Sequence, residues 1–218
     1  MIVARSVWGA RPASLPSTPM RLPATQVFIH HSVTAVTNDP YADMRAIEAV
    51  GLQRFGQFPY SFVVHPKDGL VLEGCGLLRG AHTARWNSTS FGVCWAGDYT
   101  TRAPKMQQVA ATQQLIAHLA GDGHLLPGAD VLGHMDVAAT ACPGRKLYDL
   151  LDLIRHPWEE TMPDDPALPN LPDIKFFIPI VNAQTGECRG YYIVASDGQL
   201  HAFGPGAPFF GRSEVPSG

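Results

Sequence analysis

The chain has 218 residues, of which 45% are hydrophobic and 16% charged, and its formal net charge is −3. This composition predicts a folded chain with a packed core and excludes disorder throughout. No basic excess points to a nucleic-acid partner, and no apolar run approaches the roughly 20 residues of a membrane span, so membrane insertion is not expected.

The N-terminal stretch MIVARSVWGARP is too polar for an export signal. Arg5 and Pro12 interrupt it, so it lacks the long apolar core that such a signal needs. We therefore expect a protein without a signal peptide that is made in a cytoplasm. The four cysteines, at positions 75, 94, 142 and 188, are spaced too widely for a disulfide scaffold, so free thiols are expected, with a Cys75–Cys94 bridge as the alternative.

Predicted strands and helices alternate along the first 155 residues. The run TQVFIHHSV is rich in β-branched and aromatic residues, as in a buried strand. Strands are predicted at 25–33, 60–65, 69–74, 90–97 and 130–134, and helices at 41–55, 105–123 and 144–154. This alternation, with a hairpin turn at 66–69, predicts an α/β fold in which helices flank a mixed central β-sheet.

The composition changes at His156. The segment 156–173 is rich in proline and acidic residues and has no periodicity, which is typical of a semi-extended linker. Three short β segments follow it, in a stretch near the lower size limit for independent folding. The sequence therefore predicts a main domain at 1–155, a linker at 156–173 and a small β-rich C-terminal module at 174–218.

The segment GHMDVAATACPG places His134 eight residues before Cys142. A further histidine is available from the predicted strand FIHHS. Neighbouring side chains on a strand point to opposite faces, so His30 and His31 cannot both reach one ion. Two histidines and the cysteine could converge on a metal, and three protein ligands leave a fourth position for water, as in catalytic zinc sites.

Each of these side chains also has an ordinary structural explanation. A lone histidine on a strand is commonly a hydrogen-bonded core residue, and a lone cysteine is commonly a small buried hydrophobe. Cys142 could instead be a nucleophile with His134 as its base. Spacing alone therefore leaves a metal site, a cysteine nucleophile and a set of structural residues open.

Five motifs in order give the first 155 residues a specific resemblance. They are RSVWGARP, FIHHS, FPYSFVVHPKDGLVLEG, GAHTARWNSTSFGVCWAGDY and GHMDVAATACPG. Together they resemble the zinc-dependent N-acetylmuramoyl-L-alanine amidases of the peptidoglycan-recognition-protein and phage amidase-lysozyme type. The resemblance implies the fold of that family for the main domain.

The resemblance also implies an activity, which is hydrolysis of the amide between N-acetylmuramic acid and L-alanine of the peptidoglycan stem. His30, His134 and Cys142 would hold Zn²⁺, which would lower the pKa of its bound water towards ~7 and polarise the scissile carbonyl. Tyr60 would donate a hydrogen bond to the oxygen that becomes negative. Thr140 would have a supporting catalytic role.

By the same resemblance, four residues would bind substrate: His31, His82, Trp86 and Asn87. No general base is evident, although Glu73 and Asp136 are candidates by residue type, and Asp136 could instead orient a histidine. Many recognition-type relatives carry Gly-Trp just before the Gly-Ala-His block, where this chain has Gly76-Leu77. The choice between diaminopimelate and lysine stems is therefore left open.

The paired disulfide cysteines of animal relatives are absent after the first histidine, which favours a bacterial or phage origin. We expect a phage enzyme made in the host cytoplasm that acts at the bacterial cell wall, as an endolysin or a virion tail component. The C-terminal module could contact other phage tail proteins. The alternatives are a non-catalytic peptidoglycan binder, a structural phage tail protein on the same fold and a cysteine peptidase.

Overall fold

The computed structural model describes residues 2–155, 174–181, 188–195 and 200–203. The chain divides into two compact units, Met1–Thr161 and Met162–Gly218, and each unit is described by itself. The linker expected at 156–173 lies outside the described residues, so its boundaries stay a prediction.

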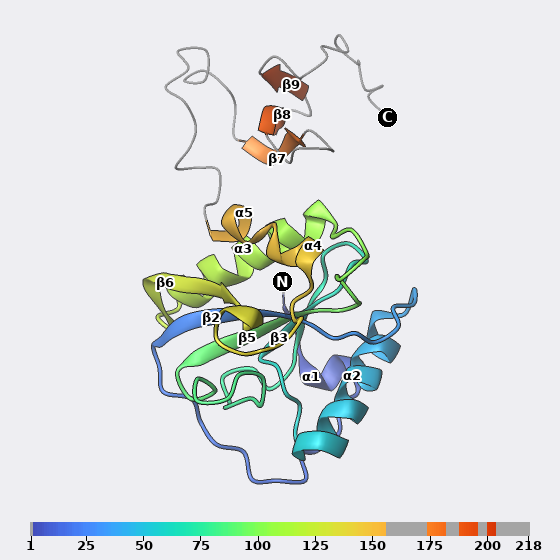
Figure 1. Ribbon diagram of the computed structural model, residues 1–218, viewed down its shortest axis with the longest axis vertical. Helices are drawn as coiled ribbons and strands as arrows, with labels where there is room; N and C mark the ends of the chain where they lie inside the picture. The colour runs from blue at the N-terminus through green and yellow to red at the C-terminus, as the bar shows by residue number, and fades with distance from the viewer. Residues whose placement is uncertain (1, 156–173, 182–187, 196–199, 204–218) are drawn as a thin grey trace. The chain divides into compact units, whose positions relative to one another are not determined.

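The first unit is built on a six-stranded mixed sheet, in the order β1-β4-β3-β5-β2-β6. Figure 1 labels β3, β5, β2 and β6 among these strands. Its strands are β1 (Ile2–Val3), β2 (Ala24–His31), β3 (Phe62–Val64), β4 (Val71–Glu73), β5 (Ser90–Trp95) and β6 (Leu125–Gly133). Its helices are α1 (Arg5–Trp8), α2 (Pro40–Phe55), α3 (Met106–Gly121), the 3₁₀ turn η1 (His134–Asp136), α4 (Arg145–Tyr148) and α5 (Leu151–Arg155). Among these described strands, β3 and β4 alone pair antiparallel, as the hairpin turn predicts.

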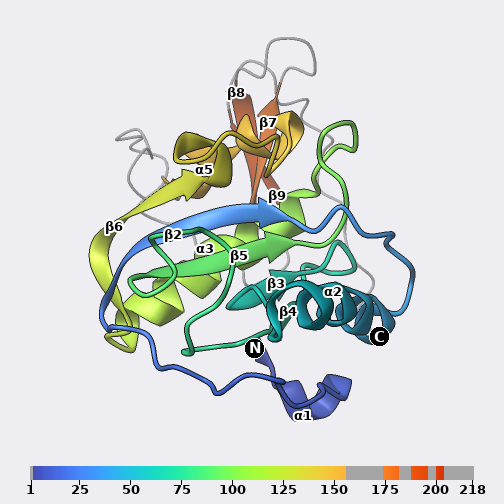
Figure 2. The ribbon, with the colours of Figure 1, turned by 60° about the horizontal axis from the view of Figure 1, so that its bottom comes forward.

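Helices cover both faces of this sheet (Figure 2), and each face has its own apolar core. On one face, Trp8 of α1 and Met44 and Ile47 of α2 pack with buried strand residues. On the other, α3, α4 and α5 supply a larger core that includes Leu115 and Leu151. The predicted α/β fold with a mixed central sheet is thereby confirmed.

The sequence determines where helix α2 begins and ends. The carboxylate of Asp39 accepts hydrogen bonds from the first backbone N–H groups of the helix, at 3.0 and 3.1 Å, and Pro40 occupies the first helical position. Gly56 closes the helix in the left-handed conformation with φ 69°. The helix is therefore held at the length that its apolar spacing predicts.

Two elements differ from the sequence expectation. Strand β6 begins five residues before the predicted 130–134, because its pairing with β2 shifts register after Ala24 and accommodates Pro127-Gly128 in an irregularity. The helix predicted at 144–154 is two short helices. The Leu150 N–H donates to the Leu147 carbonyl (3.0 Å), a tight i→i+3 bond that ends the first of them.

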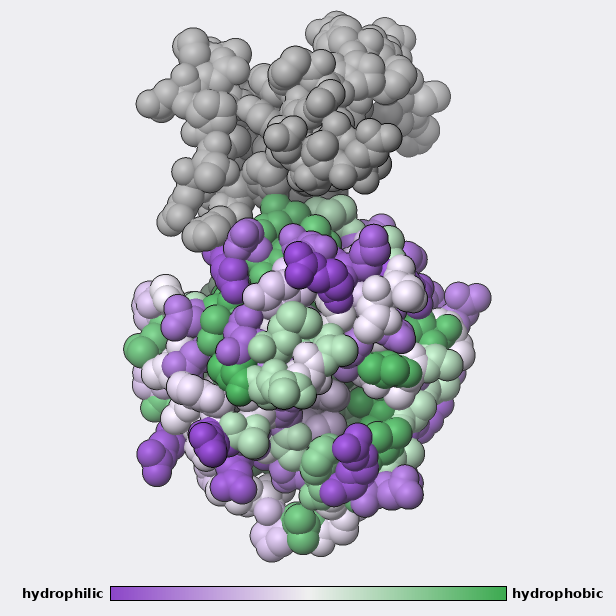
Figure 3. All heavy atoms as spheres, in the orientation of Figure 1, coloured by the Kyte–Doolittle hydropathy of each residue, from purple (hydrophilic) through white to green (hydrophobic). Residues whose placement is uncertain are grey.

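The second unit contains a three-stranded antiparallel sheet in the order β7-β8-β9. Its strands are β7 (Ile174–Val181), β8 (Cys188–Ala195) and β9 (Leu200–Phe203). Within the described residues of both units, no helix combines the length and the apolarity that crossing a bilayer requires. On the face of the first unit drawn in Figure 3, hydrophilic side chains are scattered among hydrophobic ones.

Candidate metal centre

Three elements bring the predicted ligands together at one place. His30 is near the end of the central strand β2, His134 opens the 3₁₀ turn after β6, and Cys142 lies in the loop before α4. The possible ligand atoms of these three residues all lie within 4.8 Å of one another. The structure therefore assembles the predicted His-His-Cys set from segments far apart in the sequence.

The spacing of these atoms suits a zinc ion. His30 Nδ1 lies 3.5 Å from Cys142 Sγ, and the ring centroids of His30 and His134 are 4.7 Å apart. A tetrahedral zinc with bonds of about 2.05 Å to nitrogen and 2.3 Å to sulfur separates two such ligands by about 3.5 Å. Two imidazoles and one thiol are also donors that zinc prefers, so the residues present fit this metal.

Strand register and a hydrogen bond orient His30. In the ladder, His30 is paired with Cys94 of β5, and its side chain points to the face of the sheet that α2 partly covers. Its Nε2 atom lies 3.2 Å from the hydroxyl of Thr83. Since Nε2 is engaged there, Nδ1 is the ring atom that faces Cys142.

Hydrogen bonds also fix the loop that carries Cys142. The His31 backbone N–H donates to Cys142 Sγ (3.4 Å), which connects the end of β2 to the loop. The Cys142 N–H donates to the hydroxyl of Thr140 (3.2 Å), whose side chain is exposed beside the cluster. Thr140 thus lies in the site as predicted, and its hydroxyl shapes the loop.

Burial controls the protonation of the donors. Burial lowers the pKa of His30 well below its ordinary value, with further lowering by the neighbouring His82 and His134, and burial lowers the pKa of His134 as well. Burial raises the pKa of the Cys142 thiol to about 11, against a smaller lowering by the His31 N–H. At neutral pH both imidazoles are therefore neutral and able to bind metal, while the thiol of the metal-free protein keeps its proton.

Tyr60 lies beside the cluster, two residues before strand β3. Its ring centroid lies 5.2 Å from that of His30, and its side chain is half-buried. Burial, with nearby Cys94 as the next cause, raises the pKa of Tyr60 well above its ordinary value. The phenol therefore keeps its proton at neutral pH and can donate a hydrogen bond.

The loop before β5 carries three of the predicted substrate residues. The buried His82 ring lies edge-on to His30, with centroids 5.3 Å apart, and burial lowers its pKa to about 3. Trp86 is 37% exposed and packs against Phe28 at 6.1 Å. The side-chain oxygen of Asn87 accepts the backbone N–H groups of residues 82 and 83, at 2.9 and 2.8 Å, so this oxygen organises the loop.

His31 is the predicted site residue whose ring the structure does not bring to the cluster. Its side chain is buried on the opposite face of the sheet, where Nδ1 accepts a hydrogen bond from the Tyr99 N–H (3.2 Å). The alternation of side chains along β2 explains this placement. Only the backbone N–H of His31 contributes to the site, through Cys142 Sγ.

The two candidate general bases are engaged elsewhere. One carboxylate oxygen of Asp136 accepts from the Gly133 N–H (2.8 Å), and the other accepts from the Tyr148 hydroxyl (2.6 Å), so Asp136 stabilises the turn that begins at His134. Glu73 Oε2 accepts from the Arg5 N–H (3.2 Å). Both carboxylates therefore have structural partners.

Sequence reasoning missed Thr83. This buried residue follows directly after His82 in the Gly-Ala-His-Thr motif, and its hydroxyl lies between two imidazole rings. Its adjacency to His82 was the available signal, but the sequence does not show that the loop approaches β2.

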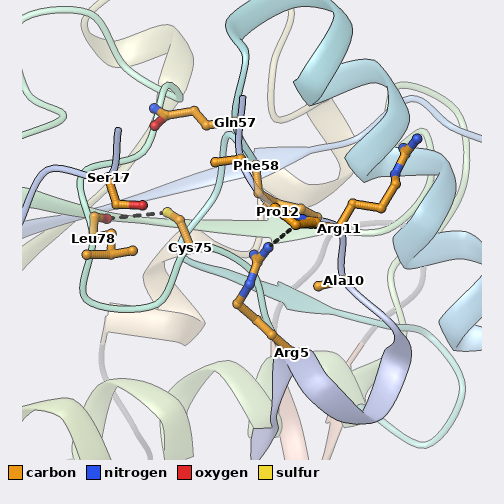
Figure 4. Close-up of a pocket in the computed structure, with 10 residues that line it drawn as sticks. Arg5, Ala10, Arg11, Pro12, Ser17, Gln57, Phe58, Cys75 and Leu78 are labelled. Carbon is orange, nitrogen blue, oxygen red and sulfur yellow. Dashed lines mark hydrogen bonds between the residues drawn. The ribbon is translucent and has the colours of Figure 1, made fainter. Parts of the chain in front are cut away.

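A separate pocket of about 330 Å³ lies between the N-terminal segment and the loops around Phe58 and Cys75 (Figure 4). None of the predicted site residues lines it. The Cys75 thiol there donates to the Leu78 carbonyl (3.3 Å), and burial raises its pKa to about 12. This pocket therefore holds an inert thiol, and the reactive side chains gather at the His-His-Cys cluster. Cys75, Cys94 and Cys142 are all free thiols, as predicted.

Known proteins resemble the chain over this same region. Residues 20–145 match the family Amidase_2, described as N-acetylmuramoyl-L-alanine amidase. The chain is 35% identical over 162 residues to peptidoglycan recognition protein 1 of Bos taurus, covering 71% of this chain and 84% of that protein. It is also 35% identical over 158 residues to N-acetylmuramoyl-L-alanine amidase of Mus musculus, covering 67% of this chain and 29% of the mouse protein.

A solved structure extends the likeness to three dimensions. The fold matches peptidoglycan recognition protein-LE in complex with tracheal cytotoxin, described as monomeric diaminopimelic acid-type peptidoglycan, with a TM-score of 0.66 and 27% identity. The match covers 70% of this chain and 92% of that one. Fold, motif order and matched residues agree, and the chain belongs to the amidase type 2 family, which includes the peptidoglycan-recognition proteins.

Proposed function

We propose that this protein is a zinc-dependent N-acetylmuramoyl-L-alanine amidase. It hydrolyses the amide between the lactyl group of N-acetylmuramic acid and L-alanine of the stem peptide in bacterial peptidoglycan. The observation that carries the proposal is the convergence of ligand atoms from His30, His134 and Cys142 within 4.8 Å, in a chain of the amidase family. Peptidoglycan as the substrate is supported by the complex of peptidoglycan recognition protein-LE described above.

Zinc, when bound, supplies an acidified water at neutral pH and polarises the scissile carbonyl. The protein's own residues do the rest. Tyr60, whose phenol keeps its proton at neutral pH, donates a hydrogen bond to the carbonyl oxygen as negative charge develops. Thr140 holds the Cys142 loop through its hydroxyl. The exposed Trp86 would border the surface on which the muramoyl-peptide lies, and His82 is buried beside His30.

Two alternatives are weaker on chemical grounds. A cysteine peptidase needs a thiolate, but burial raises the pKa of Cys142 to about 11. A non-catalytic binder on this fold has no need of the full donor set, whereas this chain retains all three donors and Tyr60. The amidase hypothesis uses every one of these residues.

The test is hydrolysis of a synthetic N-acetylmuramoyl-peptide, measured as the release of the free amine of L-alanine. We expect turnover that stops when a chelator removes zinc and returns when zinc is added. If the protein carries one zinc per chain and binds wall fragments but releases no amine, it is a non-catalytic binder. Inactivation by a thiol alkylating agent in the zinc-loaded protein, at a rate unaffected by chelator, would instead support the cysteine peptidase.

We also propose, from the sequence, that the enzyme is phage-encoded and reaches the cell wall at lysis or as part of a virion tail. In the second case the module at 174–218 contacts other tail proteins. Detecting the chain in purified virions would support the tail role. Its appearance only in lysates of infected cells would support the endolysin role.

A further inference from the structure

We infer that Thr83 is a positioning residue for the metal centre: its hydroxyl accepts a hydrogen bond from His30 Nε2 and donates one to His82 Nδ1. This arrangement keeps His30 in the tautomer whose Nδ1 is free for the metal. The inference rests on the proposed zinc site and gives a role to a residue that is not itself one of the three donors.

The distances place the three groups in one hydrogen-bonded row. Thr83 Oγ1 lies 3.2 Å from His30 Nε2 and 3.1 Å from His82 Nδ1, and all three side chains are buried. On the other side of the His30 ring, Nδ1 lies 3.5 Å from Cys142 Sγ. The row therefore begins at the ligand cluster and leads away from it.

Counting hydrogens gives the row a direction. A neutral imidazole with a metal on Nδ1 carries its hydrogen on Nε2, so Thr83 must accept from His30. A hydroxyl has a single hydrogen, which is then free to be donated to His82 Nδ1. His82 in turn carries its hydrogen on Nε2, a buried atom that has no hydrogen-bond partner among the described residues.

The far end of the row is held by packing. The His82 ring sits on the backbone of strand β5, because a Cβ atom added at Gly92 would lie 2.4 Å from His82 Cγ. A Cβ atom at Gly80 would lie 2.9 Å from the same ring. Two positions without side chains thus leave room for this imidazole, and the ring cannot easily turn away from Thr83.

The backbone of Thr83 is fixed as well. Its N–H donates to the side-chain oxygen of Asn87 (2.8 Å), and its carbonyl accepts from the Trp86 N–H (3.1 Å). Because the loop is already ordered, the hydroxyl contacts His30 without a loss of conformational entropy when the metal binds. Partners of this kind that orient metal-binding histidines typically change metal affinity by about 10- to 100-fold when removed.

The experiment compares zinc affinity in Thr83→Val, Thr83→Ser and wild type, by competition with a chromophoric chelator. Valine keeps the branched shape without the hydroxyl, and serine keeps the hydroxyl. Thr112→Val is the matched control, because Thr112 is also fully buried and its hydroxyl has two partners, the Trp95 indole (3.0 Å) and the Gln108 carbonyl (2.7 Å), on the other face of the sheet.

We expect zinc affinity to fall about 10- to 100-fold in Thr83→Val, with affinities near wild type in Thr83→Ser and Thr112→Val. Equal affinity in Thr83→Val and wild type would overturn the inference. Equal losses in Thr83→Val and Thr112→Val would also overturn it, since the effect would then be general destabilisation. Failure of the wild type to bind one zinc per chain would instead remove the proposed function.

A second measurement uses the wild-type protein alone, so it does not depend on whether a variant folds. Nitrogen-15 spectra of the histidine rings in metal-free wild type report which ring nitrogen carries hydrogen. We expect His30 and His82 both to carry it on Nε2. Hydrogen on Nδ1 of His30 would show that Thr83 donates to this ring and would overturn the assigned direction.

Discussion

At the scale of single residues, the three donors enter metal binding in different protonation states. Both histidines are neutral at pH 7, because burial lowers their pKa values, whereas the Cys142 thiol has a pKa of about 11 in the metal-free protein. Zinc binds the thiolate, so binding must displace one proton from sulfur. The cysteine therefore governs how affinity changes with pH near neutrality.

This difference predicts the pH dependence of zinc binding. Above the lowered histidine values and below about pH 7, each zinc releases the thiol proton, so the observed Kd should fall about tenfold per pH unit. Above about pH 7 the zinc-bound water ionises as well, and the fall in Kd should become steeper. Calorimetry in buffers of different ionisation enthalpy measures the protons released. Cys75→Ser should give the same slope, and binding that releases no proton below about pH 7 would contradict this assignment.

Tyr60 supports a second residue-scale prediction. Tyr60→Phe removes the phenol hydroxyl while the three ligands stay in place, so zinc should be retained and kcat should fall by about 10²-fold, as when one oxyanion donor is lost. Metal content and single-turnover rates of hydrolysis would be measured together. Full activity in this variant would mean that another group stabilises the oxyanion.

The sequence identifies the ligands through the resemblance of its five motifs to the amidase family, because residue type and spacing alone leave a cysteine nucleophile and structural residues open. His30, His134 and Cys142 are predicted in this way, and the structure brings them together. The role of Thr83 is not predictable, since a hydroxyl between two rings depends on where the loop before β5 meets β2. The His31 ring, which is predicted to bind substrate, lies on the other face of the sheet, where strand alternation already places it.

At the scale of elements, a buried carboxylate ties the start of α2 to the sheet. Asp43 accepts hydrogen bonds from the Thr37 N–H (2.7 Å) and hydroxyl (2.8 Å), and it lies 2.9 Å from Nε2 of the buried His65 on the β3 side. His65 Nδ1 accepts from the Lys67 N–H, so Nε2 carries the hydrogen and donates it to Asp43. The loop between β2 and α2 is thereby fixed.

The lowered pKa of Asp43 predicts that the protein loses stability in acid. Burial alone would raise the pKa of Asp43, but the hydrogen bonds from Thr37 and His65 outweigh it and lower the pKa. Stabilisation is therefore present above the unfolded-state value of about 3.9 and is lost as the pH falls through the lower folded-state value. Asp43→Asn should cost about 2 kcal/mol at pH 7.

Urea unfolding of Asp43→Asn and wild type at pH 7 and near pH 3 would measure this effect, with the difference expected to shrink in acid. Asp149→Asn is the control, because Asp149 forms an exposed ion pair with Arg145 and its removal should cost under about 1 kcal/mol. A constant difference between Asp43→Asn and wild type at both pH values would exclude ionised Asp43 as the cause.

Long elements with clear periodicity are predictable, and short or irregular ones are not. Helices α2 and α3 follow from apolar spacing and end within a residue or two of the prediction. Strand β1 and helix α1 span two and four residues, too few for a period to show. Pro127-Gly128 resembles a turn in sequence, and only pairing with β2 makes it part of β6.

At the scale of the whole molecule, the metal would couple binding to folding. A ligand that binds only the folded chain raises the free energy of unfolding by about 2.7 kcal/mol when its free concentration is 100 times its Kd. Wild type and Cys75→Ser should therefore show a higher Tm with zinc, whereas Cys142→Ala should not. Calorimetric scans with and without zinc measure this, and an equal Tm shift in all three proteins would point to binding elsewhere.

Strand β6 lies at the margin of the sheet, and its pairing with β2 is interrupted near its start. An ion at its far end would clasp this margin to the middle of the molecule, across 112 positions of chain between His30 and Cys142. Deprived of that clasp, the molecule should fray from this side inward, and a protease should cut after residue 133 while the interior strands still hold. Metal starvation would thus determine where the protein's degradation starts.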